Sequence, residues 1–409
     1  MKHFAIYLNN KDNKNLLLEN ILNGKFLLNG NDLSITNTAV FSAITVDKLI
    51  DEEFRHDKKI VTTANKVSLS TMSSGEQRQA VLQYLLAQHP SHVILDDVFA
   101  NFDAHSRHAI ELQLSQLVNS VCFIQFFYRT VDLLPCMTHV VLVQHGQPIE
   151  IVRKDAFVLN HATQTVKEPD FILPHMLLSD SQLTNPIVKL ANIRVSYNGK
   201  QVINDLNWTI RKGEFWQLAG ENGSGKSTLL SMICGDNPKA YGQDVYLFGY
   251  KRGSGESIWD IKRHIGYFAP DLLQQFTRPE STENMIISGF NDSIGLYKEP
   301  TDLQRKIARM WMQQLGENFN KRNFRELTSG QQRMVMVARA LVKQPPLLIL
   351  DEPTVELDDE NTALFLSMIH AIAATKRTAI VYVSHRYESN LKPSHILTLV
   401  PDVIGYKAV

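Results

Sequence analysis

The stretch EFWQLAGENGSGKSTLLSMICG, residues 214–235, contains a glycine-rich loop of a kind that can hold phosphate. A strand-like run comes first, Gly220, Gly223 and Gly225 follow, and helix-forming residues begin at Lys226. Glycines let backbone N–H groups close around phosphate oxygens, and the start of a helix adds positive potential. A glycine turn without a ligand is the alternative. The strand, loop and helix in this order favour a P-loop.

The residues of this loop divide the expected phosphate chemistry among them. Lys226 is expected to reach the β- and γ-phosphates of a nucleotide, and Ser227 to ligate Mg²⁺. The predicted nucleotide-binding set comprises Gly220, Glu221, Asn222, Gly223, Ser224, Gly225, Lys226, Ser227 and Thr228.

Two acids and a histidine follow later strand-like runs. PLLILDEP, residues 346–353, is an apolar strand that ends in Asp351 and Glu352. Alone, these could be ordinary acids at a strand end. Behind a P-loop, Asp351 is expected to hold Mg²⁺ through water and Glu352 to polarise the attacking water. His385, which ends TAIVYVSH, is the candidate for sensing the γ-phosphate, although a lone histidine at a strand end is usually structural.

Composition excludes several classes of protein. The chain has 409 residues, of which 44% are apolar. A chain of this length is too long for one ordinary core. The 42 basic and 42 acidic residues form no block of like charge, so no nucleic-acid partner is expected. The three cysteines stand far apart and favour a reduced, cytoplasmic setting. No segment has the length and apolarity of a signal peptide or a membrane span.

An internal repeat organises the chain. MSSGEQR at 72–78 matches LTSGQQR at 327–333, VILDD matches LILDE, and Asp103 matches Asp358. The offset is 255 throughout, so 32 residues align without a gap. We expect a first domain over 1–155, a linker over 156–186 and a second domain over 187–409.

These motifs resemble those of the ATP-binding-cassette (ABC) ATPases. LTSGQQR is similar to their signature loop, DEP to their Walker B motif and Leu357–Asp358 to their D-loop. Tyr197, in VSYNGKQVINDLNW, resembles the aromatic residue that stacks on adenine, although an aromatic in a hairpin is more often a packing residue. The resemblance covers residues 188–405 and implies an Mg²⁺-dependent ATPase.

HIGYFAPDLLQQF and GDNPKAYGQDVYLFGYKRGSGESIWDIKRHIGY resemble more narrowly the tandem-ABC group called ModF or photorepair protein, named for a role in molybdate transport. One position departs from the wider family. Where most members have a glutamine that touches Mg²⁺ and relays to a membrane partner, IGYFAP has Pro270. Gln274 or Gln275 could substitute from a shifted loop.

The first half lacks the residues that would serve a nucleotide of its own. HFAIYLNNKDNKNLLLENILNG resembles the P-loop stretch in outline, but every loop glycine has gone. Lys14 is either a relic of the phosphate lysine or, as lysines in loops usually are, a solvated side chain. Asp97 replaces the water-polarising glutamate, and Tyr128 stands in the histidine position.

The first signature, by contrast, is kept. Cassettes of the ABC family pair head to tail, so the resemblance implies that Ser73, Ser74 and Gly75 contact ATP held by Lys226. The second signature is equally well formed, although it would serve only the degenerate site. It is kept either for packing or because the second halves of two chains pair, which leaves a monomer or a homodimer open.

We therefore predict an α/β protein with two P-loop NTPase-type ABC domains, each with a helical subdomain that is reduced in the first, degenerate half. The expected activity is hydrolysis of ATP to ADP and phosphate. The resemblance implies a cytoplasmic subunit, peripheral at the inner face of a membrane, that serves a permease for molybdate or another oxyanion. The alternative is a soluble ATPase switch that acts on a macromolecule in translation or repair; a non-hydrolysing regulatory module is disfavoured by Glu352 and His385.

The two signatures can be separated by matched variants. Gly75→Asp places an anion against phosphate, so it should nearly abolish ATP hydrolysis while leaving ADP affinity intact. Ser73→Ala should cost about 1.5–3 kcal/mol of ATP binding, the value of one charge-assisted hydrogen bond. Gly330→Asp should be tolerated if the two halves of one chain pair. ATPase rates with light scattering test this: an inactive Gly330→Asp beside an active Gly75→Asp would refute the role of the first signature.

Overall fold

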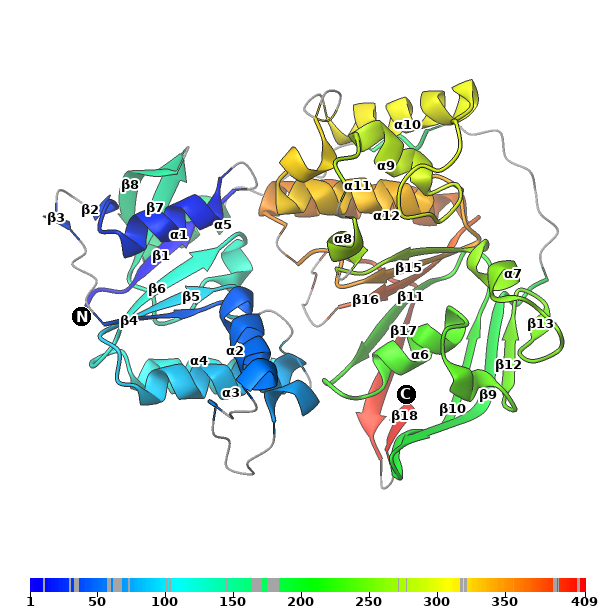
Figure 1. Cartoon of the computed structure of the whole chain (residues 1–409), viewed down its shortest axis with the longest axis horizontal. Coiled ribbons are helices and arrows are strands. Elements are labelled where there is room, and N and C mark those ends of the chain that lie inside the picture. Colours follow the sequence, from blue (N-terminus) through cyan, green and yellow to red (C-terminus); the bar gives the residue numbers. More distant parts are fainter. Residues whose placement is uncertain are drawn as a thin grey trace. The chain divides into compact units, whose positions relative to one another are not determined.

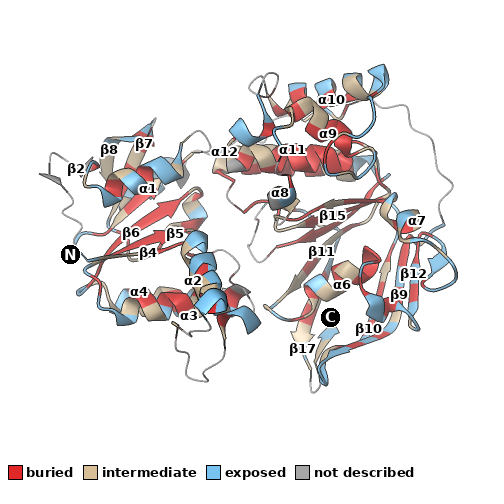
Figure 2. Ribbon diagram, viewed as in Figure 1, coloured by how far each residue is buried: buried red, intermediate tan, exposed pale blue. Residues whose placement is uncertain are grey.

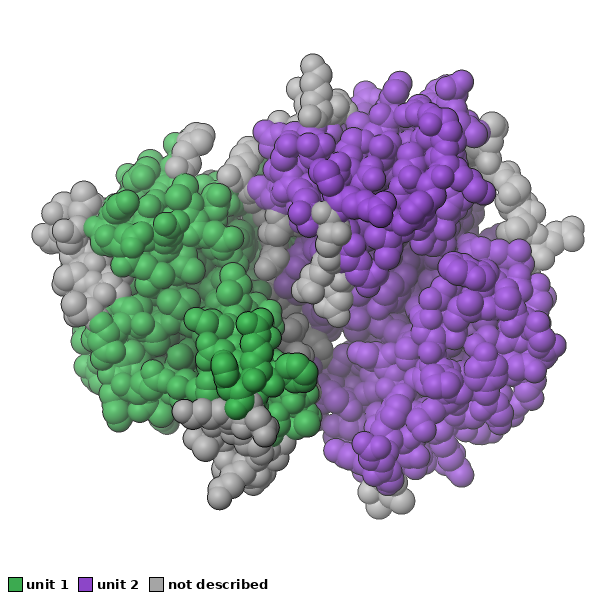
Figure 3. Space-filling model, viewed as in Figure 1, with its two compact units in different colours: residues 1–167, 356–360 green, residues 168–355, 361–409 purple. Residues whose placement is uncertain are grey.

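The computed structural model divides into two compact units. Unit 1 comprises residues 1–167 and 356–360, and unit 2 comprises residues 168–355 and 361–409 (Figure 3). The structure describes the whole chain except residues 10–11, 29–30, 33–36, 57–59, 62–67, 73, 100–101, 103, 145, 163–170, 175–183, 271, 277, 317–318, 320–321, 356, 385–387, 389 and 403–404.

Unit 1 is built on a six-stranded sheet with the order β4-β5-β6-β1-β7-β8. The first five strands run parallel and β8 pairs antiparallel with β7. A separate small hairpin is formed by β2 and β3. The strands are β1 (Phe4–Tyr7), β2 (Leu27–Leu28), β3 (Asn31–Asp32), β4 (Thr38–Phe41), β5 (His92–Asp96), β6 (Cys122–Phe127), β7 (His139–Gln144) and β8 (Gln147–Arg153).

Helices cover both faces of this sheet (Figure 1). One core contains residues of α1, and the other contains residues of α2, α3 and α4. All six residues of β6 are buried, as expected for a strand covered on both sides (Figure 2). The helices are α1 (Lys14–Leu22), α2 (Ala43–His56), α3 (Ser74–Ala87), α4 (Ala104–Gln116) and α5 (Lys154–Ala162), with short 3₁₀ turns η1 (Leu69–Thr71) and η2 (Thr130–Asp132).

Unit 2 contains a ten-stranded sheet with the order β13-β12-β9-β10-β18-β17-β11-β16-β15-β14. The strands β17, β11, β16, β15 and β14 run parallel, while β13, β12, β9 and β10 pair antiparallel. The strands are β9 (Val188–Tyr197), β10 (Lys200–Ile210), β11 (Phe215–Gly220), β12 (Asp244–Leu247), β13 (Tyr250–Lys251), β14 (Ile265–Phe268), β15 (Leu347–Asp351), β16 (Ala379–Val383), β17 (His395–Pro401) and β18 (Tyr406–Ala408).

The helices of unit 2 form two groups. α6 lies on one face of the parallel strands and α11 and α12 lie on the other (Figure 1). Between β14 and β15 the chain forms a helical subdomain of α8, α9 and α10. The helices are α6 (Lys226–Ile233), α7 (Ile258–Lys262), α8 (Leu272–Gln275), α9 (Thr282–Ser288), α10 (Asp302–Leu315), α11 (Ser329–Leu341) and α12 (Asp359–Thr375), with turns η3 (Pro238–Ala240) and η5 (Phe324–Glu326).

The repeat seen in the sequence is also present in backbone conformation and in hydrogen bonding. Asp97 and Glu352, which are 255 residues apart, have φ values of 46° and 47°, a left-handed conformation that is uncommon outside glycine. The side-chain amide of Gln77 donates to the Leu69 carbonyl at 2.9 Å, and that of Gln332 donates to the equivalent carbonyl of η5 at 3.0 Å. The two halves therefore share one local structure as well as one sequence pattern.

The predicted α/β class with two cassettes is confirmed, including the larger helical subdomain of the second half. The predicted boundary at residue 155 falls inside α5, whose Phe157 is buried in the core of unit 1.

Candidate functional site

The P-loop connects β11 to α6 at the carboxyl edge of the parallel strands. β11 lies between β16 and β17 in the sheet, so the loop leaves from an interior strand. Gly220, Gly223 and Gly225 have φ values of 150°, 75° and 98°. A Cβ at Gly220 would lie 2.7 Å from the Ser224 Oγ, and one at Gly225 would lie 3.0 Å from Ile203. This backbone path requires glycine at both positions.

Lys226 is the first residue of α6 and folds back over the loop. Its Nζ donates to the carbonyl oxygens of Gly220 at 2.8 Å and Glu221 at 2.7 Å, and the residue is 8% exposed. The Ser224 Oγ is fully buried and has no hydrogen-bond partner among the described residues. Ser227 is exposed at the same helix start. These groups fit a bound phosphate chain with its metal: the Lys226 ammonium, the hydroxyls of Ser224 and Ser227, and the glycine loop.

The two acids lie at the same edge of the sheet. Asp351 ends β15 in register with Val383 of β16, and Val383 is in register with Leu218 of β11. Both acids are half-buried, and the Glu352 N–H donates to the Val383 carbonyl at 2.9 Å. Parallel strands therefore bring the acid pair to the level at which the P-loop begins.

The other predicted residues of unit 2 differ in how they can be placed. His385 lies outside the described residues. Tyr197 ends β9 and is 41% exposed. Gln275 ends α8 and is exposed.

Burial raises the pKa of the Cys234 thiol, at the end of α6, to about 12, so this thiol stays protonated.

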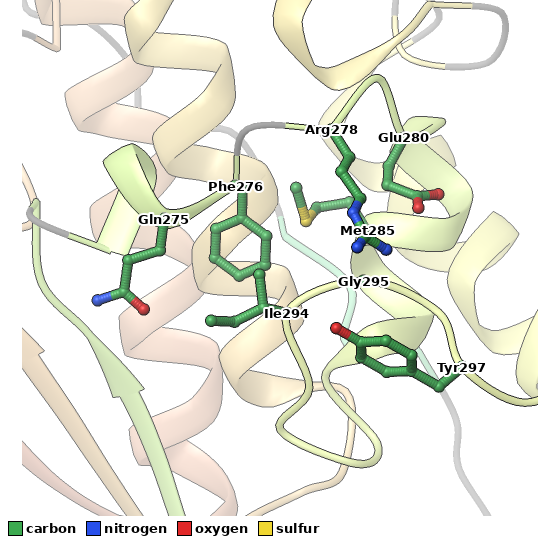
Figure 4. Close-up of a pocket in the computed structure, with 8 residues that line it drawn as sticks. All are labelled: Gln275, Phe276, Arg278, Glu280, Met285, Ile294, Gly295 and Tyr297. Carbon is green, nitrogen blue, oxygen red and sulfur yellow. The ribbon is translucent and has the colours of Figure 1, made fainter.

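A cavity of about 240 Å³ lies in the helical subdomain of unit 2 (Figure 4). None of its lining residues belongs to the P-loop or to the acid pair, so it is separate from the phosphate chemistry. Gln275, one of the two candidates for the missing glutamine, is on its wall. The lining comprises Gln275, Phe276, Arg278, Glu280, Met285, Ile294, Gly295 and Tyr297.

Sheet register identifies the residue of unit 1 that corresponds to the phosphate lysine. In unit 1, Phe126 of β6 is in register with both Asp96 and Ile6. In unit 2, one residue of β16 is likewise in register with both Asp351 and Leu218. Because Asp96 and Asp351 are equivalent in the repeat, Ile6 of β1 occupies the position of Leu218 in β11.

Lys14 then falls on the position of Lys226. Each lysine follows its reference residue by eight positions and is the first residue of its helix. Matching the two stretches in outline, from Phe4 to Gly24, places Lys14 one residue away from this position. Sheet register corrects that alignment.

Lys14 is not a solvated loop lysine, which corrects the usual expectation for a lysine in a loop. Its Nζ lies 3.0 Å from the Asp96 carboxylate, and the Asp96 side chain is 9% exposed. The lysine at the phosphate position thus neutralises the carboxylate at the magnesium position. Neither the sequence spacing nor the motif indicated this pair, because the two residues come from separate elements.

The loop before Lys14 is closed by its own side chains. The Asn9 N–H donates to the Asp12 carboxylate at 3.1 Å, and the Asp12 N–H donates to the Asn9 carbonyl at 3.0 Å. Asn13 caps α1 by accepting from the Leu16 N–H at 3.1 Å. The P-loop of unit 2 has a counterpart of the Asp12 bond, since the Ser224 N–H donates to the Glu221 carbonyl at 3.2 Å. The hydrogen bonds accepted by the Asp12 and Asn13 side chains are therefore what distinguishes the described part of this loop.

The remaining predicted residues of the first half are placed in part. Asp97 has the backbone conformation of Glu352, and its carbonyl accepts from the Arg78 guanidinium at 2.6 Å. Gly75 is buried in the first turn of α3. Ser73 lies outside the described residues, and of Ser74 only the backbone, which begins α3, is described.

Comparison with known proteins agrees with this geometry. The model of the ABC transporter family matches residues 203–355. The chain is 34% identical over 390 residues to the ABC transporter ATP-binding protein ModF of Escherichia coli, covering 89% of this chain and 79% of that protein. This chain belongs to the ABC ATP-binding protein family.

Other known proteins match over smaller parts of the chain. The uncharacterised ABC transporter ATP-binding protein C323.04 of Schizosaccharomyces pombe is 29% identical, over 79% of this chain and 66% of its own length. A solved structure, the ADP- and Pi-bound dimer of the ATP-binding cassette MJ0796, is 26% identical over 52% of this chain and 93% of its own, with a TM-score of 0.43. As a member of this ABC family, the chain binds and hydrolyses ATP. Among its described helices, none is long and apolar enough to cross a membrane.

Breaking the ion pair of unit 1 should destabilise that unit. Lys14→Met leaves a nearly buried Asp96 carboxylate without its cation, and we expect a loss of about 1–3 kcal/mol in the free energy of unfolding. Lys25→Met, at an exposed lysine of the same region, is the matched control. Denaturant unfolding of the Lys14→Met, Asp96→Asn and double variants measures the coupling. Additive losses, with no recovery in the double variant, would show that the pair contributes nothing.

Proposed function

We propose that this protein is the ATP-hydrolysing component of a membrane transporter and that it carries one catalytic site per chain, in unit 2. The observation that carries the proposal is the contrast between the loops that precede the two helix-start lysines. The loop before Lys226 is a glycine cradle that fits phosphate, whereas the loop before Lys14 contains no glycine. The printed name of the ModF relative, an ABC transporter ATP-binding protein, supports the link to transport.

The residues of unit 2 divide the reaction in the proposed site. Lys226 and the loop N–H groups bind and orient the phosphates, with Ser227 and Asp351 as the residues that hold Mg²⁺. When bound, Mg²⁺ neutralises charge on the phosphate oxygens. Glu352 orients the attacking water and accepts its proton. His385 contacts the γ-phosphate, and Tyr197 stacks on the base.

The substrate of transport is a finer proposal than the ATPase. An oxyanion such as molybdate is proposed only on the ModF resemblance. A second function, a switch that acts on a macromolecule without a permease, is favoured by Pro270, which occupies the position after β14 where a relay glutamine would stand. Glu352→Gln, loaded with MgATP, should co-purify with an integral-membrane partner from detergent-solubilised membranes; co-sedimentation with ribosomes instead would favour the switch.

Nucleotide stoichiometry tests the single site. Calorimetry should give one tight MgATP site per chain, because only Lys226 lies on an intact glycine loop. Lys226→Ala should abolish both binding and turnover. Two tight sites per chain would contradict the proposal.

The acid at the end of β15 should separate binding from turnover. Glu352→Gln should keep MgATP affinity and lower the ATPase rate at least ~10²-fold, the scale of one lost general base. Asp97→Asn, at the equivalent backbone position of unit 1, is the matched control and should have little effect. A larger loss in Asp97→Asn would mean that the active half has been assigned the wrong way round.

A further inference from the structure

Tyr197 is held by its hydroxyl as well as by its backbone. The residue pairs with Lys200 across the β9–β10 hairpin. Its Oη accepts a hydrogen bond from the Asn237 Nδ2 at 3.0 Å. The ring is therefore fixed at two ends, by the strand and by the amide.

Asn237 is a buried residue whose side-chain donors and acceptor all have hydrogen-bond partners. It is 6% exposed, and its Nδ2 also donates to the Ser231 Oγ at 3.0 Å. Its Oδ1 accepts from the Lys239 N–H at 3.0 Å, which caps η3. Both amide hydrogens and the carbonyl oxygen have partners, so the side chain has one orientation.

The chain of hydrogen bonds continues into the phosphate-binding helix. Ser231 lies on α6, and its Oγ donates to the Thr228 carbonyl at 2.8 Å. The Asn237 N–H donates to the Ser231 carbonyl at 3.1 Å. Thr228 is two residues beyond Lys226. The Tyr197 ring is thus connected by side chains to the helix that carries the phosphate lysine.

A cation faces the same ring. The Lys239 Nζ lies 5.1 Å from the centroid of the Tyr197 ring, within the range of a cation–π contact. Tyr197 is 41% exposed, so part of its surface is accessible to a flat, apolar partner.

We propose that Asn237 is a positioning residue that holds the Tyr197 ring at a set place relative to α6, so that the site prefers purine nucleoside triphosphates over a bare triphosphate. The inference rests on the proposed function, because it takes Tyr197 as the surface for the base and Lys226 as the group that binds phosphate. Asn237 touches no ligand itself. It fixes the span between base and phosphate before ligand arrives, which lowers the ordering cost of binding.

The test compares ligands with and without a base. Calorimetry measures the Kd of MgATP and of magnesium triphosphate for the wild type, Tyr197→Phe, Asn237→Ala and the double variant. Tyr197→Phe removes the acceptor but leaves the η3 cap intact, so it isolates the connection from the structural role of Asn237. Asn207→Ala, at an exposed amide of β10, is the matched control.

We expect each single variant to weaken MgATP about 3–10-fold, the scale of one hydrogen bond. The double variant should be no weaker than Asn237→Ala, and the affinity for magnesium triphosphate should not change in any of them. Equal losses for both ligands, additive losses in the double variant, or no loss in Tyr197→Phe would each overturn the inference.

Two further outcomes separate this inference from the proposed function. Tyr197→Ala should bind MgATP and triphosphate with similar affinity; if it keeps the preference for MgATP, the base does not lie on Tyr197 and the inference fails while the ATPase stands. A wild-type chain that binds no MgATP would refute the proposed function itself.

Discussion

A phosphate chain can be held by backbone N–H groups only where the backbone comes close to it, and this constraint decides what each half of the chain can do. In unit 2 the path is taken by glycines whose replacement would bring a Cβ to within 2.7 Å of a neighbouring side chain at Gly220. In unit 1 the equivalent loop has no glycine, and the side chains of Asp12 and Asn13 accept from the N–H groups of Asn9 and Leu16. The loops that follow β1 and β11 therefore differ in what they can hold, although both follow an interior strand that pairs parallel with its two neighbours.

Unit 1 also has to compensate the negative charge of the nearly buried Asp96 carboxylate. A carboxylate at the position of Asp96 is nearly buried, and a buried charge without a partner is costly. In a working cassette the magnesium ion supplies the compensating charge. In unit 1 Lys14 supplies it, from the helix position that Lys226 occupies in unit 2. Under the proposed function, the same type of side chain at the same helix position serves a ligand in unit 2 and the fold in unit 1.

Sequence reasoning was most successful where chemistry depends on residues close together in the chain. The P-loop, the acid pair and the repeat with its offset of 255 follow from local spacing, and the α/β cassettes follow from them. The Lys14–Asp96 pair could not be predicted, because it depends on sheet register that an alignment in outline misplaces by one residue. The contact of Asn237 with Tyr197 could not be predicted either, because it joins residues 40 positions apart through a turn whose sequence carries no motif.

The shared left-handed backbone of Asp97 and Glu352 separates fold from catalysis in this protein. Both residues leave their strand in the same conformation, so the turn after the acid strand is retained whether or not the half hydrolyses nucleotide. At the acid position itself the two halves differ by one methylene of side chain. A Glu-to-Asp change shortens the reach of a general base without disturbing the strand that carries it. Unit 1 therefore has the sheet, the core and the signature helix of a cassette, and in it the Lys14–Asp96 pair gives a nearly buried carboxylate its cation.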